Sequence, residues 1–158
     1  MRTPSFGAYA STHVDRTAMN DFGHRMLNRA HRGLLAVTRG RVGSRLGSMP
    51  VIELHTVGRS SGARRSAMLT APLHEPGRYV LVASKGGDPR HPAWYLNLLA
   101  HPDVEITVHG RTQQMRARTA DPAERAALWP AITQAYPGYA GYQRKTSREI
   151  PVVICEPR

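Results

Sequence analysis

The sequence predicts an α+β fold in which a small antiparallel β-barrel is flanked by short helices. Three observations support this fold class. About six segments carry alternating or β-branched apolar residues, and glycine- or proline-containing turns separate them. Several of these turns are short enough to join neighbouring strands as hairpins. The intervening segments carry helix-start signals, and there are neither internal repeats nor low-complexity tracts.

The first 48 residues are predicted to form a basic, partly helical extension ahead of the barrel. Residues 1–17 show no periodicity, whereas apolar side chains between positions 19 and 37 recur every three or four residues, as on one face of a helix. Arg25, Arg29 and Arg32 share the rest of its surface. It either packs its apolar face on the domain or rests on an anionic membrane surface as a peripheral contact. The barrel domain itself is expected over residues 49–158.

The elements of the barrel follow from apolar patterning and turn signals. Pro-Gly at 76–77 and His-Gly at 109–110 mark turns, and a short helix is expected from Pro92 to about Ala100. The expected strands, in chain order, cover residues 51–57, 67–73, 78–83, 104–108, 112–119 and 150–155.

Two helical elements are expected between the last two strands. Asp121 can cap a helix, Pro122 fits its first turn, and Glu124 occupies the capping-box position. Pro130 lies within this predicted helix, so we expect the helix to kink or restart there. Pro137 marks the start of a second short element.

The composition is typical of a single soluble domain. The chain has 158 residues, of which 41% are hydrophobic, and no apolar run is long enough to span a bilayer. The N-terminus lacks the apolar core of a signal peptide, and Cys155 is the only cysteine, so no intrachain disulfide is possible. We therefore expect a cytoplasmic protein in which Cys155 is a buried core residue.

A formal net charge of +11 indicates an anionic partner. Such a charge favours nucleic acid, acidic lipid or a polyanionic cofactor, and charge alone does not choose among them. No nucleic-acid-binding motif accompanies the charge, so a nucleic acid is not expected as a partner. The histidines are scattered without metal-ligand spacing, and no Gly-x-Ser-x-Gly elbow occurs. Neither a metal site nor a serine hydrolase is therefore expected.

Two loops carry residue types that bind anions. Residues 58–65 place glycines around two serines, with arginines beside them, so that backbone N–H groups could form a concave nest. The same composition is typical of an ordinary solvated hairpin loop, and spacing alone favours that interpretation. The segment 83–97 is more specific, because Lys85 and two glycines follow a strand and precede a helix with two aromatic residues in its first turn. This combination suits a ligand with an anionic tail and a planar ring.

Three tyrosines near the C-terminus form a third group. Tyr136, Tyr139 and Tyr142 are spaced by three, which keeps them on neighbouring faces of a short helix. They either pack the helix on the core or line a pocket that donates O–H groups to a carbonyl or nitro oxygen of a substrate.

Together these motifs resemble the deazaflavin-dependent nitroreductase and quinone reductase family of actinobacteria. The resemblance covers about residues 49–158 and is carried by four segments, namely 56–62, 83–108, 136–143 and 150–157. It implies a split β-barrel, similar to FMN-binding split barrels, that binds the reduced 8-hydroxy-5-deazaflavin coenzyme F420. The phosphate and carboxylates of that coenzyme give the charge of +11 a reason.

The resemblance also implies roles for individual residues. The anionic tail of the coenzyme would contact Arg59, Ser60, Ser61, Arg65, Ser84 and Lys85. The ring would lie beside Ala83, Gly86, Ala93, Trp94, Tyr95 and Asn97. The catalytic residues facing the acceptor would be Tyr136, Tyr139 and Tyr142. Family members often have lysine where Ser60 stands, so one tail contact is expected either to be weaker in this protein or to be supplied by Arg64.

The expected function is hydride transfer from reduced coenzyme F420 to quinone-like, nitroaromatic or nitroimidazole acceptors, by a monomer or homodimer. The cofactor carries the hydride, so no catalytic dyad is needed. Two alternatives remain open at this point. One is an FMN-dependent oxidoreductase on the same barrel, and the other is a non-catalytic, arginine-rich protein that binds anionic membrane or nucleic acid.

Overall fold

The computed structural model describes residues 45–46 and 49–158. Its strands are β1 (Arg45–Leu46), β2 (Met49–Val57), β3 (Arg64–Thr70), β4 (Leu73–Glu75), β5 (Arg78–Val82), β6 (Asp103–Val108), β7 (Arg111–Thr119) and β8 (Val152–Pro157). Its helices are the 3₁₀ turn η1 (Lys85–Gly87), α2 (Ala93–Ala100), α3 (Pro122–Ala135) and α4 (Gly138–Arg144).

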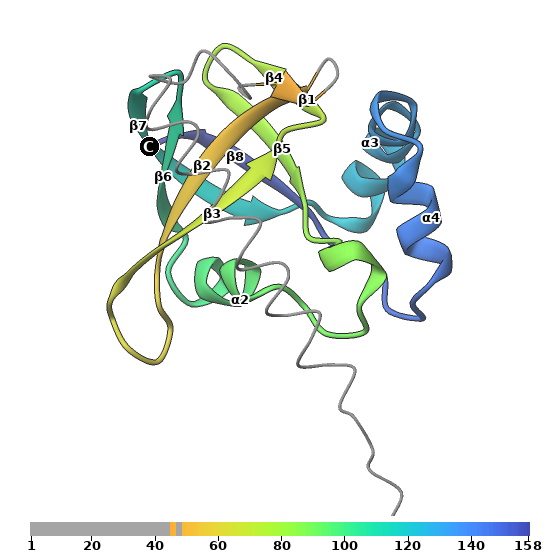
Figure 1. Ribbon diagram of the computed structural model, residues 1–158, viewed down its shortest axis with the longest axis horizontal. Coiled ribbons are helices and arrows are strands. Elements are labelled where there is room, and N and C mark those ends of the chain that lie inside the picture. The colour runs from red at the N-terminus through yellow and green to blue at the C-terminus, as the bar shows by residue number, and fades with distance from the viewer. Residues whose placement is uncertain (1–44, 47–48) are drawn as a thin grey trace, which may run out of the picture.

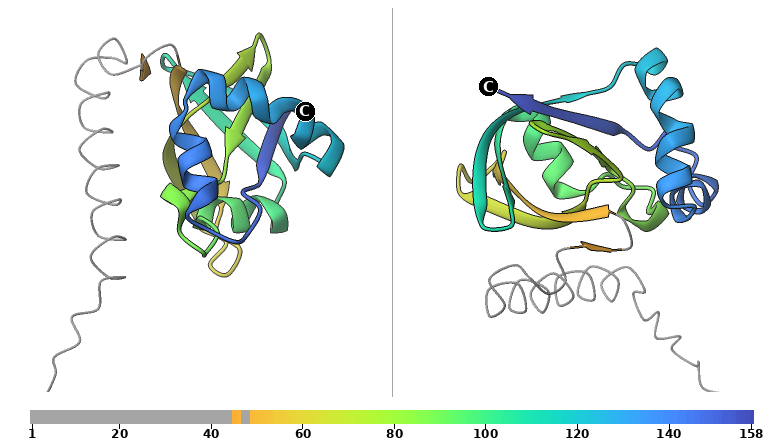
Figure 2. Two further views of the ribbon diagram at one scale, coloured as in Figure 1. Left: turned by 90° about the vertical axis from the view of Figure 1, so that its right-hand side faces the viewer. Right: turned by 90° about the horizontal axis from the view of Figure 1, so that it is seen from above.

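The strands form one antiparallel sheet that curls into a split barrel. The strand order is β1-β2-β6-β7-β8-β5-β4, and β3 pairs with the other side of β2. Helix α2 lies across one end of the curled sheet, while α3 and α4 stand together beside it (Figures 1 and 2). The predicted α+β split-barrel class is confirmed.

Two hydrophobic clusters lie on opposite faces of β5 and β8. Val153 and Cys155 of β8 join Trp94 of α2 in the cluster inside the barrel. Val152 and Ile154 face the other way and pack with residues of α3 and α4. A strand covered on both faces needs apolar side chains at every position, which explains the uninterrupted apolar run near the C-terminus. Burial also raises the pKa of the Cys155 thiol to about 12, as expected for an unreactive core cysteine.

Several turn and cap predictions are confirmed. The hairpin between β6 and β7 turns at His109 and Gly110, both with positive φ, and this backbone matches the twist of the two strands. Asp121 Oδ1 accepts from the Glu124 backbone N–H at 2.8 Å, and Glu124 Oε2 accepts from the Asp121 N–H at 3.0 Å. This reciprocal pair is the expected capping box at the start of α3.

Of the two outcomes expected at Pro130, the restart is wrong, because helix α3 continues to Ala135, and the kink stays a prediction. Proline removes the N–H that would bond to the carbonyl of Ala126. Both residues lie on the exposed side of the helix, so water can satisfy that carbonyl without a break.

The strand expected over 67–73 is shifted toward the N-terminus. The β2–β3 pairing runs on to Val57 opposite Arg64, and Leu73 instead belongs to β4, where it pairs with Val80. Bonds across the connecting loop favour the earlier start, since the Gly58 N–H donates to the Ala63 carbonyl at 2.8 Å. With β4 and the two-residue β1, the described sheet has eight strands instead of about six.

The N-terminal extension lies outside the described residues, apart from Arg45–Leu46. The helix expected over 19–37 and its membrane contact therefore stay predictions. In the described part of the chain, no helix has the length and apolarity needed to cross a membrane.

Candidate functional site

Helix α2 joins the two loops that were predicted to bind anions. The 83–92 segment leads directly into α2, and Asn97 on that helix bonds to the β2–β3 loop. Asn97 Oδ1 accepts from the Arg59 backbone N–H at 3.2 Å, and its Nδ2 donates to Thr56 Oγ1 at 3.2 Å. Asn97 is only 6% exposed, so its amide is committed to holding this loop. The contact with a ligand ring implied for Asn97 stays a prediction.

The β2–β3 loop and the start of β3 carry exposed arginines. Ser61 Oγ lies inside the loop, where it accepts from the Ala63 N–H at 3.3 Å and from Arg65 Nη2 at 3.4 Å. Arg59 and Arg65 are both exposed, and among the described residues neither forms an ion pair with a carboxylate. Arg64, by contrast, is paired with Glu105. Ser60 is exposed at the tip of the loop.

The 84–88 segment forms a tight left-handed turn. Lys85, Gly86 and Gly87 all have positive φ, at 47°, 67° and 86°. This conformation is unfavourable for lysine but accessible to glycine. Ser84 is mostly buried, and the space where a Gly86 side chain would project is open. The turn therefore exposes its backbone at Gly86, as a loop that approaches a ligand closely requires.

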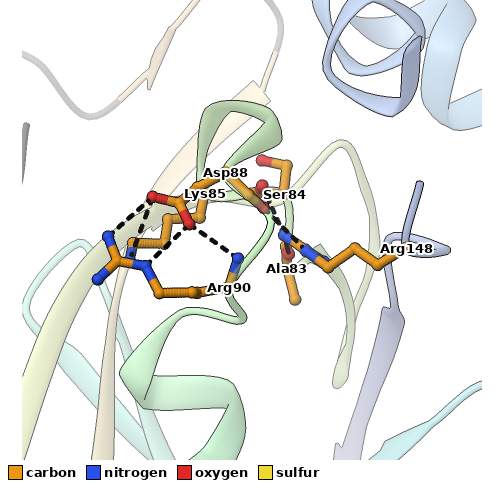
Figure 3. A network of polar contacts seen from close by, with 6 residues as sticks. All are labelled: Ala83, Ser84, Lys85, Asp88, Arg90 and Arg148. Carbon is orange, nitrogen blue, oxygen red and sulfur yellow. Dashed lines mark hydrogen bonds and ion pairs between the residues drawn. The ribbon is translucent and has the colours of Figure 1, made fainter. Parts of the chain in front are cut away.

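Asp88 organises the charges of this turn. Its Oδ2 lies 3.6 Å from Lys85 Nζ and 3.2 Å from Arg90 Nη2, while its Oδ1 accepts from the Arg90 backbone N–H at 2.8 Å. The hydrogen bond from the Arg90 side chain lowers the pKa of Asp88 to about 2. Figure 3 shows this carboxylate facing the cationic ends of both side chains. Asp88 thus stays ionised and fixes the Lys85 ammonium beside the turn.

Arg148 braces the same turn from the other side, and sequence reasoning missed it. Its Nη2 donates to the carbonyls of Ala83 at 3.2 Å and Ser84 at 2.9 Å, and its Nε donates to the Asp88 carbonyl at 2.9 Å (Figure 3). Its Nη1 lies 3.3 Å from His91 Nδ1. Burial, followed by the charge of Arg148, lowers the pKa of His91. No local pattern marks Arg148, because its partners lie far away in the chain.

The aromatic residues of α2 are buried in the barrel core. Trp94 and Tyr95 meet edge to face with centroids 6.2 Å apart, and both belong to the cluster that contains Ala83. The Tyr95 hydroxyl is 3.1 Å from Thr119 Oγ1, so its polar end is satisfied within the protein. Ala93 is exposed in the first turn of α2. The ring contacts implied for these residues stay predictions.

The structure brings the three predicted tyrosines together. Their ring centroids are 5.3 to 6.3 Å apart, and the Tyr139 hydroxyl lies 3.1 Å from Thr70 Oγ1. A hydrogen bond with Tyr136 and burial raise the pKa of Tyr142 to about 12. The Tyr136 ring lies where a side chain on Gly138 would project, so glycine at that position makes this arrangement possible.

Helix α4 (the tyrosine helix) carries Tyr139 and Tyr142, while Tyr136 lies just before it as the C-cap of α3. The tyrosine helix packs directly against the glycine turn. A Cβ atom on Gly87 would lie 2.7 Å from the Tyr142 carbonyl oxygen and 2.8 Å from Lys145 Cβ. Only glycine allows this approach. Gly87 therefore connects the 83–97 segment to the tyrosines, and Asn97 connects the same segment to the β2–β3 loop. All three groups identified in the sequence are thus joined by direct contacts.

This set of side chains fits a polyanionic coenzyme. Guanidinium and ammonium groups from two loops, together with a glycine turn, are typical donors to phosphate and carboxylate. Among residues 45–46 and 49–158, no three His, Cys, Asp or Glu side chains gather in a way that could hold a metal ion.

Comparisons with known proteins agree with this assignment. Residues 27–157 match the family model described as F420H(2)-dependent quinone reductase. An F420H(2)-dependent quinone reductase of Mycobacterium tuberculosis is 41% identical over 132 residues, which cover 81% of this chain and 88% of that protein. A solved structure of an F420-H2 dependent reductase is 42% identical in sequence, with a TM-score of 0.61. The match covers 68% of this chain and 94% of the chain in that structure.

A second solved structure, described as a domain-swapped dimer, is 36% identical in sequence, with a TM-score of 0.63. That match covers 89% of this chain and 98% of the chain in that structure. The family match spans most of the chain, including the cationic loops and the tyrosine helix. The chain belongs to the F420H(2)-dependent quinone reductase family, whose cofactor is the reduced deazaflavin coenzyme F420.

Proposed function

We propose that this protein transfers a hydride directly from reduced coenzyme F420 to a quinone, and that nitroaromatic or nitroimidazole compounds serve as further acceptors. The observation that carries the proposal is the direct packing of the tyrosine helix against the glycine turn at Gly87. This contact brings the helix that carries Tyr139 and Tyr142 next to the loop whose charge and backbone suit the coenzyme.

The cationic side chains bind the anionic tail in this proposal. Arg59 and Arg65 are exposed without a carboxylate partner in the described part of the chain. Ser60 and Ser61 supply hydroxyls in the loop between them, and Ser84 supplies one next to Lys85. Lys85 adds an ammonium that Asp88 holds beside the turn. The ring is assigned to the segment formed by Ala83, Gly86, Ala93, Trp94, Tyr95 and Asn97.

The bound coenzyme supplies the hydride, and the protein orients the acceptor and moves a proton. A quinone that accepts a hydride at one centre also needs one proton to become the hydroquinone. Tyr142 has a pKa of about 12, so it is a neutral phenol at physiological pH and can donate a hydrogen bond to a quinone oxygen. Tyr136 is 36% exposed, and its ring centroid lies 6.3 Å from that of Tyr142, so it can relay a proton from solvent. Tyr139, held by Thr70, fixes the position of the other two rings.

The test uses reduced coenzyme F420 that carries deuterium at the donating carbon, mixed anaerobically with menadione. We expect one equivalent of hydroquinone for each coenzyme oxidised, with a primary isotope effect on the rate. Binding of the coenzyme without quinone reduction, or turnover without an isotope effect when chemistry is rate-limiting, would contradict hydride transfer. A nitroimidazole tested in parallel decides the second acceptor class.

Tyrosine variants then test the assigned roles. Tyr142→Phe and Tyr136→Phe should lower kcat with menadione and leave coenzyme affinity nearly unchanged, since neither is assigned to the coenzyme. Tyr79→Phe is the matched control, because Tyr79 is a buried tyrosine of β5 within the barrel cluster. Equal losses in all three variants would show that the effect comes from packing.

A further inference from the structure

The guanidinium of Arg148 occupies the inside of the 83–91 loop, where several of the loop's polar groups converge. We infer that Arg148 is a positioning residue that holds this loop in its coenzyme-binding conformation, by bonding to the loop backbone instead of to the coenzyme. The inference rests on the proposed role of Ser84 and Lys85 in binding coenzyme F420.

The hydrogen bonds of Arg148 reach both ends of the loop. Before the glycine turn, Arg148 donates to the carbonyls of Ala83 and Ser84, and after the turn it donates to the carbonyl of Asp88. The remaining contact is to His91 Nδ1, which lies 3.3 Å from Nη1. A guanidinium has five N–H groups, and these four contacts use most of them. Little donor capacity is left for a ligand.

The loop needs such a support because its own backbone provides few bonds. The Gly87 N–H donates to the Ser84 carbonyl at 3.0 Å, and the Asp88 N–H donates to the Lys85 carbonyl at 3.2 Å. Lys85 is also held at a φ of 47°, which a lysine adopts only when its surroundings impose it. Arg148 gathers carbonyls from both sides of this residue and so maintains the conformation.

The backbone of Arg148 is itself fixed by the tyrosine helix. Gln143 on α4 donates from Nε2 to the Arg148 carbonyl at 2.8 Å, and its Oε1 accepts from the Ile150 N–H at 2.9 Å. Arg125 of α3 donates to the same Oε1 at 3.0 Å. The 83–91 loop is therefore attached, through Arg148, to the helices that carry the tyrosines.

Replacing Arg148 by lysine distinguishes a positioning role of this side chain from a purely electrostatic one. An arginine that only attracts the anionic tail is replaceable by lysine, and its effect fades as salt screens the charge. An arginine that bridges several carbonyls is not replaceable, because a single ammonium lacks the planar fork of donors. Arg148→Lys and Arg148→Met should then behave alike.

The experiment measures the full-length protein with two readouts. Coenzyme F420 is titrated at low and high salt into the wild type, Arg148→Lys, Arg148→Met and the control Arg144→Met. Arg144 is an exposed arginine at the end of α4, so its removal changes the charge equally without touching the loop. Amide hydrogen exchange of residues 84–91 is measured without coenzyme.

We expect both Arg148 variants to raise the coenzyme Kd about tenfold or more at either salt concentration, as loss of several charge-assisted hydrogen bonds implies. Arg144→Met should stay within about twofold of the wild type at high salt, where surface charge is screened. The amides of the 84–91 loop should exchange faster in both Arg148 variants. The KM for menadione at saturating coenzyme should change little, because the tyrosines are not altered.

Three outcomes would overturn the inference. Wild-type affinity in Arg148→Lys would show that charge alone matters, and unchanged exchange in a variant with weakened binding would mean that Arg148 acts on the coenzyme directly. Faster amide exchange in the loop with an unchanged coenzyme Kd would instead show that the loop does not contribute to coenzyme binding. That result would contradict the proposed role of Ser84 and Lys85. If Arg148→Met does not fold, the lysine variant alone decides between these outcomes.

Discussion

Replacing Asn97 by leucine tests how the β2–β3 loop is held. Leucine has the same number of side-chain heavy atoms as asparagine, branched at the same carbon, but lacks the amide that links α2 to Thr56 and Arg59. If Asn97 served only to touch the coenzyme ring, the variant would lose coenzyme affinity and keep its stability. The structure predicts that both fall together, because the amide is committed to the protein.

The size of the effect follows from which groups lose their partner. Thr56 is 3% exposed, so its hydroxyl would be left buried without the Asn97 bond, whereas the Arg59 N–H lies in an exposed loop and regains water. One buried unsatisfied group costs about 1–3 kcal/mol, so we expect the free energy of unfolding to fall by about 2 kcal/mol. That corresponds to roughly a thirtyfold change in the unfolding equilibrium.

Urea unfolding and coenzyme titration of four proteins provide the measurement: wild type, Asn97→Leu, Thr56→Val and the double variant. Removing both partners leaves no buried polar group without a hydrogen bond. The double variant should therefore lose about 1 kcal/mol less free energy of unfolding than the two single variants lose together. Gln114→Leu removes an exposed amide that bonds to Glu105 and should change stability by less than about 0.5 kcal/mol. Additive single losses, or full stability in Asn97→Leu, would refute the reasoning.

Three further predictions concern the turn, the tyrosines and the helix cap. Gly86→Ala should lower the free energy of unfolding by about 1 kcal/mol, measured by thermal denaturation, because this position has a positive φ. Gly87→Ala should lower it by about 2 kcal/mol or more, because φ is positive there too and the new Cβ also meets α4. Tyr136→Phe should bring the pKa of Tyr142 down from about 12 toward 10, measured by ultraviolet titration, since the Tyr136 hydrogen bond is the main cause of the shift. Glu124 has a folded-state pKa of about 2 against a usual 4.5, so the stability it contributes is present above pH 4.5 and lost as the pH falls toward 2. Urea midpoints that fall equally with pH in Glu124→Gln and the wild type would contradict this last assignment.

Local patterns in the sequence predicted much of the fold. The apolar run at the C-terminus, the His-Gly turn and the Asp-Pro-x-Glu cap each depend on neighbouring residues, and each produced the expected element. The displaced start of β3 was missed, because exposed arginines at 64 and 65 give no apolar signal for a strand. Only pairing with β2 defines that strand.

The sequence by itself determined the fold class, the family and the residue types that suit the coenzyme, since these depend on periodicity and on short motifs. Tertiary structure alone decided which polar groups bond to one another. The bond from Arg148 to Ala83 spans 65 positions, and the bond from Asn97 to Thr56 spans 41. Nothing local to an arginine or an asparagine specifies such a partner, because the match is made only when the folded chain brings a buried donor to a distant acceptor.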